Sequence, residues 1–443
     1  MNVMICFTLF VIIQLNILAQ NPVWKVYQGN IPGTSIYLGA HLVIHSDNNG
    51  DKWIDYMSGF QGALLKFDDY LWTEFNANNS NYPEALCTAI VSDSDNVLWI
   101  GTGGAGIGGG LIKFDMNDFT IYDTPEFTLF NDRISSIATE DGDIWVGTDG
   151  NGLFKFDGVN WTRHDILNSC LSVNCISAIA IDNDGNKWIG NYDDYGWRGG
   201  LVMLNDSMCT VYNKTNSGLL SNRVTAIVID DLGNKWIGSS PEGGGLAKFD
   251  GINWTVYTPS NSGLPTANLL CLEIESNGNI WIGTYGYGLV KFDGSNWTIF
   301  NTYNSDIPGN TVNSISIDRF GNKWIATYSG IGVYREDGVI LKSENDNSLP
   351  TNFTLNNNYP NPFNPSTIIK YSIVEQSRVK INVYNLLGEM VLELVNTEQT
   401  AGYYEINFNA NNLPSGVYFY SIFAEPVKGG NVFRDVKKML LIK

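Results

Sequence analysis

A tryptophan recurs along most of this chain at a nearly constant spacing, and no other feature limits the possible folds as strongly. The repeated positions are about 45 residues apart on average, a typical period for propeller repeats. Each copy lies in a similar stretch, clearest at residues 230–249, that holds several short apolar runs of strand type. The pattern predicts an all-β chain with a seven-bladed β-propeller whose blade cores contain Trp53, Trp99, Trp145, Trp188, Trp236, Trp281 and Trp324.

Each repeat contains four predicted strands, which in the best-preserved copy lie at residues 224–229, 235–239, 245–249 and 253–257. The first hairpin turn carries Asp, Gly and Asn, as at residues 182–186, and the second carries Phe-Asp-Gly-x-Asn-Trp, as at residues 249–254. These residues favour tight turns because Asp and Asn cap their own backbone and Gly accepts positive φ. Both hairpin turns must share one face, so the variable loops share the opposite face, where we expect any binding site.

The segment at residues 24–27, Trp-Lys-Val-Tyr, precedes the first full repeat but matches the fourth strands of later repeats, such as residues 254–257. We expect it to supply the outer strand of the last blade, which would close the ring and remove two exposed strand edges. Residues 339–341 compete for the same position, so the sequence leaves the identity of this strand open.

The repeats resemble the two-component regulator propeller repeat, whose pattern is Asp-x-x-Gly-x-x-Trp-Ile-Gly-Thr followed by a Gly-Leu strand. The resemblance covers about residues 24–341, and the first and last repeats depart from it at Asp55 and Ala326, where glycine is usual. Terminal repeats are often atypical, which agrees with a count of seven. Similar propellers form the periplasmic sensing part of hybrid two-component regulators, so the resemblance implies a ligand-binding module.

Three further segments flank the predicted propeller, which we place at residues 20–341. Residues 1–19 are largely apolar and are followed by Gln20, so they are interpreted as a secretory signal peptide. Residues 342–352 are polar and show no strand pattern, as expected of a linker. Residues 353–443 contain six or seven short apolar runs separated by turn signals, which predicts a small immunoglobulin-like β-sandwich.

The C-terminal segment resembles the type A sorting domain of the type IX (Por) secretion system, close to FlgD-like immunoglobulin modules. The resemblance rests on Tyr-Pro-Asn-Pro-Phe-Asn-Pro-Ser-Thr at residues 359–367, Val-Tyr-Asn-Leu-Leu-Gly at 383–388, Leu-Pro-Ser-Gly-Val-Tyr at 413–418 and the terminal Lys-Lys-Met-Leu-Leu-Ile-Lys. It implies that the type IX secretion machinery is a partner of this domain. It also implies a bacterial protein that is secreted or placed on the outer-membrane surface.

The charge is unevenly distributed and disfavours one class of partner. Of the 26 Lys and Arg and the 45 Asp and Glu residues, 8 and 7 lie from residue 350 onward, which leaves 18 against 38 in the N-terminal part. An acidic surface of this kind repels phosphate backbones, so nucleic acid is not an expected partner. After the signal peptide no apolar run is long enough to span a bilayer, so we expect no membrane-spanning segment in the mature chain.

Five cysteines remain once the signal peptide is removed: Cys87, Cys170, Cys175, Cys209 and Cys271. An exported chain can hold disulfides, and Cys170 with Cys175 is the pair that we consider, although the sequence does not decide its state. Cys87, Cys175 and Cys271 lie in strand-like runs, where buried thiols are usual.

Motifs that could carry catalysis, a metal or a cofactor have simpler interpretations. Gly-Thr-Gly-Gly-Ala-Gly at residues 101–106 lacks the helix that a nucleotide site requires, and residues 182–186 lack the bidentate Glu of a calcium loop. His41, His45 and His164 show no spacing typical of a zinc site or a catalytic triad. We therefore expect no catalytic residue, no metal and no cofactor.

Aromatic and acidic residues in the variable loops supply the candidate ligand site. Flat aromatic rings stack on the apolar face of a sugar while carboxylates accept its hydroxyl groups; packing of these aromatics between blades is the alternative interpretation. The candidates are Tyr192, Asp193, Asp194, Tyr195, Trp197, Arg198, Tyr285, Tyr287, Tyr328, Asp149 and Glu242, with Tyr56 at a comparable place.

These observations favour a non-catalytic binding module that recognises a glycan or polysaccharide at the cell surface or outside the cell. Two alternatives stay open. The same loops could form a platform for protein–protein adhesion to a surface protein. The chain could also resemble propeller lyases, with His164 or an acidic loop residue as the base.

Overall fold

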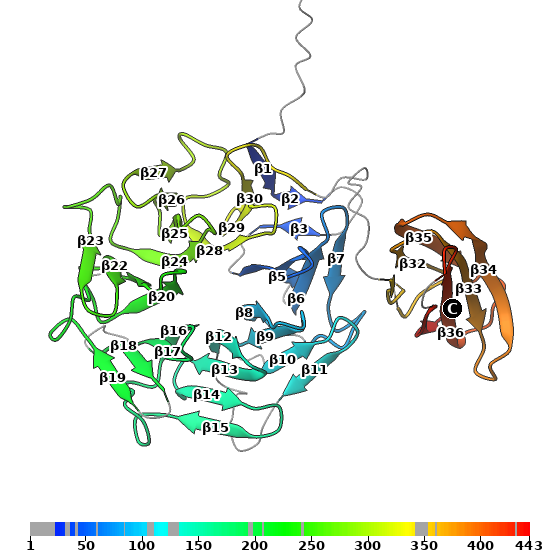
Figure 1. Ribbon diagram of the computed structural model, residues 1–443, viewed down its shortest axis with the longest axis horizontal. Helices are drawn as coiled ribbons and strands as arrows, with labels where there is room; N and C mark the ends of the chain where they lie inside the picture. Colours follow the sequence, from blue (N-terminus) through cyan, green and yellow to red (C-terminus); the bar gives the residue numbers. More distant parts are fainter. Residues whose placement is uncertain are drawn as a thin grey trace, which may run out of the picture.

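The repeats form seven four-stranded antiparallel sheets around a central axis, as the ribbon of the computed structural model shows (Figure 1). This confirms the predicted propeller. The predicted signal peptide, residues 1–19, and the predicted linker, residues 342–352, lie outside the described residues. The structure describes residues 23–31, 36–39, 43–58, 61–83, 85–103, 110–122, 133–193, 198–205, 208–240, 243–341, 353–358, 361–429 and 432–443.

The first three blades each use four consecutive strands, with the first strand nearest the axis (Figure 1). Blade one comprises β4 (Ile44–Ser46), β5 (Lys52–Ser58), β6 (Gln61–Phe67) and β7 (Trp72–Phe75). Blade two comprises β8 (Cys87–Ser92), β9 (Leu98–Thr102), β10 (Leu111–Phe114) and β11 (Phe119–Tyr122). Blade three comprises β12 (Ile134–Glu140), β13 (Asp143–Thr148), β14 (Leu153–Phe156) and β15 (Trp161–His164).

The next three blades repeat this order. Blade four comprises β16 (Ile176–Ile181), β17 (Lys187–Tyr192), β18 (Gly199–Leu204) and β19 (Cys209–Tyr212). Blade five comprises β20 (Val224–Ile229), β21 (Lys235–Ser239), β22 (Gly245–Phe249) and β23 (Trp254–Tyr257). Blade six comprises β24 (Leu269–Ile274), β25 (Ile280–Thr284), β26 (Leu289–Phe292) and β27 (Trp297–Phe300).

Blade seven joins the two ends of the propeller. Its strands β28 (Val312–Ile317), β29 (Lys323–Thr327) and β30 (Gly330–Tyr334) are completed by β1 (Trp24–Tyr27), which pairs antiparallel with β30. The N-terminal segment is therefore the closing strand. Residues 339–341 do not form it, because the Asn322 side chain holds Ile340 instead, accepting its N–H at 3.0 Å. A short hairpin of β2 (Gly29–Asn30) and β3 (Tyr37–Leu38) follows the closing strand.

The repeat tryptophans are buried, which confirms their predicted place in the blade cores. Each indole N–H also donates to the acidic residue that begins the first hairpin turn of its own blade, at 2.8 to 3.4 Å. In blade four that acid is Asp182, whose other oxygen caps the turn by accepting the N–H of Asn186 at 2.9 Å. The turn acids are Asp47, Asp93, Glu140, Asp182, Asp230, Glu275 and Asp318.

Neighbouring blades are tied together at the start of their inner strands. The hydroxyl groups of Thr88, Ser135 and Ser177 each donate to a carbonyl at the first position of the next inner strand, at 2.5 to 2.7 Å. Because these side chains reach across the blade junction, hydrogen bonds as well as apolar packing hold the inner ring together.

The C-terminal residues form two packed sheets, which confirms the predicted sandwich. One sheet has the order β31 (Thr354–Leu355), β32 (Ser366–Ile373) and β35 (Gly402–Asn409). The other has the order β34 (Met390–Gln399), β33 (Ser377–Tyr384), β36 (Gly416–Pro426) and β37 (Phe433–Leu441). Ile369 and Phe408 from the first sheet pack with Val383 and Tyr420 from the second in a buried core.

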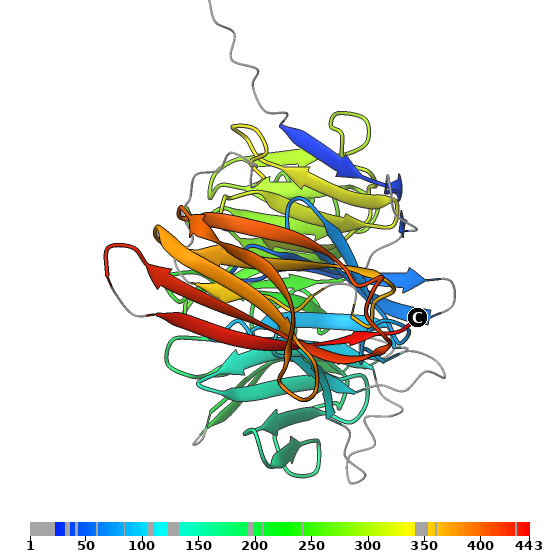
Figure 2. The same ribbon diagram turned by 90° about the vertical axis from the view of Figure 1, so that its right-hand side faces the viewer.

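The sandwich lies beside the outer edge of blades one and two (Figure 2). Lys370 Nζ is 3.4 Å from Asp68 Oδ2, in the turn between β6 and β7. Asn357 donates to the side-chain oxygen of Asn117, in the turn between β10 and β11, at 3.1 Å. The contact uses polar groups on both sides.

The pairing of Cys170 with Cys175, which the sequence left undecided, does not form, because Cys170 is bonded to Cys209 and Cys175 is in no disulfide. Cys170 lies in the link between blades three and four, and Cys209 begins the outer strand β19. The disulfide therefore fastens the link to the outer strand of the next blade, whereas a bond within the link would join residues that are already close in the chain.

Candidate functional site

The loops between the second and third strands lie on one face of the propeller, here called the loop face. In blades two, three, five, six and seven a hydroxyl at the end of the second strand donates to the carbonyl of the glycine that precedes or begins the third strand. These bonds measure 2.6 to 3.1 Å and hold both ends of each loop at a fixed separation. The bonded pairs are Thr102–Gly110, Thr148–Gly152, Ser239–Gly245, Thr284–Gly288 and Thr327–Gly330.

In blades three to six, the residue that follows the second strand or ends it is held against the residue that enters the inner strand of the same blade. The backbone N–H of Asp149 donates to Arg133 at 3.0 Å, and that of Tyr192 donates to Cys175 at 3.1 Å. Ser240 and Tyr285 bond to the carbonyls of Arg223 and Asn268 in the same way, each at 3.1 Å. Loop residues and strand-entry residues therefore lie together on the loop face.

Three of the predicted tyrosines are half exposed on the loop face of neighbouring blades. Tyr285 and Tyr287 belong to blade six and are 56% and 52% exposed, and Tyr328 of blade seven is 53% exposed. Rings that are this accessible do not have the buried position expected of aromatics packed between blades. Tyr56 differs, because it is 7% exposed within β5 and belongs to a blade core, so its inclusion among the loop residues was wrong.

Other candidates fall at the longest predicted loop, residues 191–200. Tyr192, Asp193 and Arg198 are described, and Arg198 is exposed. Asp194, Tyr195 and Trp197, together with Glu242 of blade five, lie outside the described residues. His41 and residues 104–106 of the glycine-rich segment do so as well.

Tyr192 lies at the centre of a charged cluster formed by blades three, four and five. The guanidinium of Arg223 lies 4.7 Å from the centre of the Tyr192 ring, a cation–π contact. On blade three Arg133 is 3.4 Å from Asp149 Oδ2. Burial raises the pKa of the Tyr192 hydroxyl, and the negative charge of Asp149 raises it further. The tyrosine therefore stays protonated and able to donate a hydrogen bond at neutral pH.

Arg133 and Arg223 are not among the site residues predicted from the sequence. They occupy the same place in two repeats, directly before the inner strand, and comparison of the repeats could have found them. Asn191 was also missed. It stands at the end of the second strand, where other blades have the hydroxyl that bonds to the loop glycine. Its side chain is fully buried, and neither its Nδ2 nor its Oδ1 has a hydrogen-bond partner among the residues that the structure describes.

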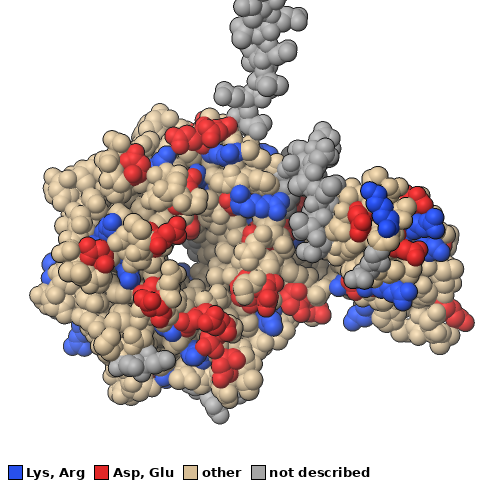
Figure 3. Space-filling model, viewed as in Figure 1, with Lys and Arg blue, Asp and Glu red and all other residues tan. Residues whose placement is uncertain are grey.

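The propeller is open at its centre, and acidic side chains gather around this opening on the face shown in Figure 3. Such a distribution agrees with the excess of Asp and Glu in the N-terminal part of the chain. Three arginines also lie on the loop face: Arg133, which pairs with Asp149, Arg198 and Arg223.

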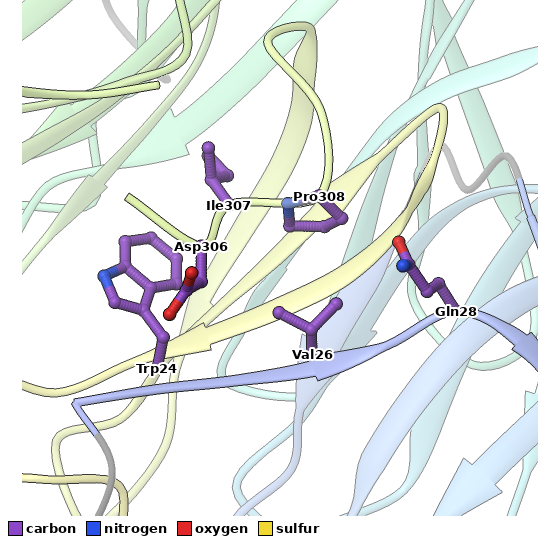
Figure 4. A pocket seen from close by; sticks show the side chains of 6 residues that line it. All are labelled: Trp24, Val26, Gln28, Asp306, Ile307 and Pro308. Carbon is purple, nitrogen blue, oxygen red and sulfur yellow. The ribbon is translucent and has the colours of Figure 1, made fainter. Parts of the chain in front are cut away.

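A hollow of about 410 Å³ lies away from these residues, between the closing strand and the link from blade six to blade seven (Figure 4). Trp24, Val26 and Gln28 of the N-terminal segment form one side. Asp306, Ile307 and Pro308 of the link form the other.

His164, which we named as a candidate lyase base, packs against a neighbouring aromatic ring. His164 ends the outer strand β15, and its ring stacks on Trp145 with centroids 5.7 Å apart. Burial lowers its pKa, with a smaller contribution from the charge of Lys155. The described part of the chain contains no group of three or more His, Cys, Asp or Glu side chains placed to hold a metal ion.

Two family models match parts of the chain. Residues 263–286 match the two component regulator propeller, and residues 357–428 match the secretion system C-terminal sorting domain. The chain carries a regulator-type propeller repeat and a secretion sorting domain. The sorting domain shows that the protein is exported, to the cell surface or beyond it, and that the secretion system handles its C-terminal domain. Among the described residues, no helix has the length and apolar character needed to cross a membrane.

Solved structures share the fold at low sequence identity. The extracellular domain of BT3049 from B. thetaiotaomicron is 20% identical with a TM-score of 0.59; the match covers 95% of this chain and 57% of that one. PorZ, a surface component of the type IX secretion system of Porphyromonas gingivalis, is 18% identical with a TM-score of 0.54, over 93% and 61%. This chain thus spans less than two thirds of either.

A smaller solved protein, a streptogramin B lyase, is 15% identical with a TM-score of 0.56, and the match covers 70% of this chain and 97% of that one. At this identity the likeness shows the propeller fold alone. No curated protein matches the chain.

Proposed function

We propose that this exported propeller is a glycan-binding module whose ligand lies on the loop face. The observation that carries the proposal is the exposure of Tyr285, Tyr287 and Tyr328 on neighbouring blades. Aromatic rings that are held by braced loops and open to solvent can stack on the apolar faces of successive sugar rings. A rigid platform also lowers the entropic cost of binding a flexible chain.

The arginines narrow the ligand to an acidic glycan. Arg223 stacks on Tyr192. Among the described residues, neither Arg223 nor the exposed Arg198 forms an ion pair. A guanidinium without a carboxylate partner is suited to a carboxylate or sulfate on a sugar ring, which it can bind with two parallel hydrogen bonds. In a chain of net charge −19 such a cluster gives local attraction for an anion that the remaining surface repels.

A glycan array that contains polyuronates, sulfated glycans and neutral polysaccharides tests the ligand class, followed by calorimetry with the best ligand. We expect Arg223→Leu to weaken binding of the acidic glycan by about 10- to 100-fold, the loss typical of one charged hydrogen-bonding group. Tyr285→Ala and Tyr328→Ala should each weaken binding to acidic and neutral glycans alike. Ile252→Ala, 86% exposed on a hairpin turn of the opposite face, is the matched control.

The outcomes separate the two parts of the proposal. If neutral and acidic glycans bind equally and Arg223→Leu leaves this binding unchanged, the protein is a glycan-binding module without a preference for acidic glycans. Absence of binding to any glycan would remove the module itself and favour a protein partner on the same face. Shortening of a polyuronate chain during incubation would instead show a lyase.

A further inference from the structure

The links between blades cover the outer-strand tryptophans in a repeated way. In blade five, Gly218 of the incoming link lies directly on Trp254, and a side chain at that glycine would clash with the indole. In blade six, Gly263 lies on Trp297 in the same manner, where an added Cβ would be 2.7 Å from the tryptophan Cβ. The link glycine thus fills the space over the indole in both blades.

Blade seven departs from this arrangement at the equivalent position. The outer-strand tryptophan is Trp24, and the residue in the place of the glycine is Asp306. A residue with a Cβ cannot lie on the indole as the two glycines do, because the indole and the Cβ would occupy the same space. The hollow of about 410 Å³ is found at this point, between the closing strand and the link (Figure 4).

The groups that line this hollow suit a polyhydroxyl ligand. The Asp306 carboxylate lies beside Trp24, and the Gln28 amide lies at the far end (Figure 4). Among the described residues the Asp306 and Gln28 side chains have no hydrogen-bond or ion-pair partner. Trp24 is held by contacts with Tyr334 at 4.9 Å and Phe300 at 5.8 Å between ring centroids, so its indole borders the hollow in a fixed position.

We propose that this hollow is a second carbohydrate site, which binds one neutral hexose residue. Its volume falls in the range of about 300–1,000 Å³ that is usual for small-molecule sites. The indole can stack on the C–H face of a pyranose, the carboxylate can accept two of its hydroxyl groups, and the amide can both donate and accept. The site carries a carboxylate and none of its lining residues is a cation, so it disfavours acidic sugars, unlike the loop face.

Saturation-transfer NMR on the full chain, with glucose, galactose, mannose and N-acetylglucosamine at millimolar concentration, tests the site. We expect transfer to at least one hexose. Any transfer to glucuronate would come from the loop face, so Asp306→Gly should leave it unchanged. Asp306→Gly, which restores the residue used in blades five and six, should lower affinity at least tenfold while the melting temperature stays the same or rises. Gln28→Ala is a second variant that removes a ligand group and leaves the link unchanged.

Ile252→Ala, on a hairpin turn of the opposite face, is the control and should leave hexose binding unchanged. The proposal is overturned if no neutral hexose shows transfer. It is also overturned if binding survives in both Asp306→Gly and Gln28→Ala, or if Tyr285→Ala abolishes it, since the sugar would then lie on the loop face.

Discussion

The ammonium of Lys235 lies 4.6 Å from the centre of the Trp188 ring, across the junction between blades five and four. The same nitrogen is 3.4 Å from Asp182 Oδ2, which also accepts the indole N–H of Trp188 at 2.8 Å. One lysine therefore contacts both the tryptophan and the turn acid of the preceding blade. The arrangement recurs with Lys187 over Trp145, Lys323 over Trp281 and Lys52 over Trp324.

We expect Lys235→Leu to lower the free energy of unfolding by about 1–2 kcal/mol at pH 7, the range for a partly desolvated cation–π contact. Blade two already carries Leu98 at the equivalent position, so the new side chain suits the site. Burial raises the pKa of Asp182, but hydrogen bonds from Trp188 and Asn186 and the charge of Lys235 outweigh it, so the pKa lies below the usual value. Urea unfolding at several pH values measures the effect.

The pH dependence of this variant has a definite sign. A carboxylate with a lowered pKa contributes stability above its unfolded-state pKa and loses it as the pH falls through the folded-state value. The cost of Lys235→Leu should therefore shrink in acid, where Asp182 is protonated. Lys214→Leu, at an exposed position, should cost little at any pH, and an equal loss for both variants would contradict the assigned contact.

Loss of the Cys170–Cys209 disulfide should lower stability by about 3–4 kcal/mol, the chain-entropy value for a closed loop with a sequence separation of 39. Cys170→Ser with Cys209→Ser, followed by thermal unfolding with and without reductant, measures this. Cys175→Ser should change little, because that thiol forms no disulfide. Reductant should affect the wild type and the Cys175 variant but not the double variant.

A second pair of substitutions, copied from the next repeat, tests the place of this disulfide more specifically. Cys170 and Cys209 occupy the places of Gly218 and Trp254 in the next repeat, where a glycine lies on a tryptophan. Cys170→Gly with Cys209→Trp should therefore recover part of the stability that the double serine variant loses. Identical melting temperatures for the two double variants would show that the places are not equivalent.

Glu273→Gln should stabilise the protein above pH 7. Burial raises the pKa of Glu273 in β24 to about 7 because the charged carboxylate is poorly solvated there. Between its unfolded-state pKa and about pH 7 the folded state binds the extra proton, so stability falls as the pH rises through this window. We expect a gain of about 1–2 kcal/mol at pH 8, since the side chain keeps some contact with solvent.

The gain should vanish below about pH 4.5, where Glu273 is protonated in both states. His45, whose pKa burial lowers to about 4, acts in the opposite direction and removes stability as the pH falls below about 6.5. The variant must therefore be compared with the wild type at each pH. Glu425→Gln, at an exposed position of the C-terminal sandwich, is the control, and a gain independent of pH would contradict the buried carboxylate.

Most of the fold could be predicted because its signals are local and repeated. The nearly continuous apolar run of strands such as β20, the acid that caps each turn and the glycine with positive φ act within a few residues of each other. The tryptophan spacing counts the blades, and each tryptophan meets a turn acid five or six residues before it in its own blade. The core positions were therefore correct in every repeat.

The candidate site was predicted less completely, because its members come from different blades. Tyr285, Tyr287 and Tyr328 were found in the variable loops, but nothing near Tyr192 in the sequence indicated that Arg223 would stack on it. Tyr56 was misplaced because the loops vary in length from repeat to repeat. The sequence therefore did not show that the second strand of blade one continues past Tyr56.

The sequence by itself determined the strands, their turns, the number of blades and the two-part architecture, since these depend on residue pattern within one repeat. Only the tertiary structure decided that Trp24–Tyr27 closes the ring on β30, that Cys170 pairs with Cys209 and that Arg223 reaches Tyr192. Each of these contacts joins residues that are distant in the chain and become neighbours only when the ring of blades closes. They depend on ring geometry, which no single repeat contains.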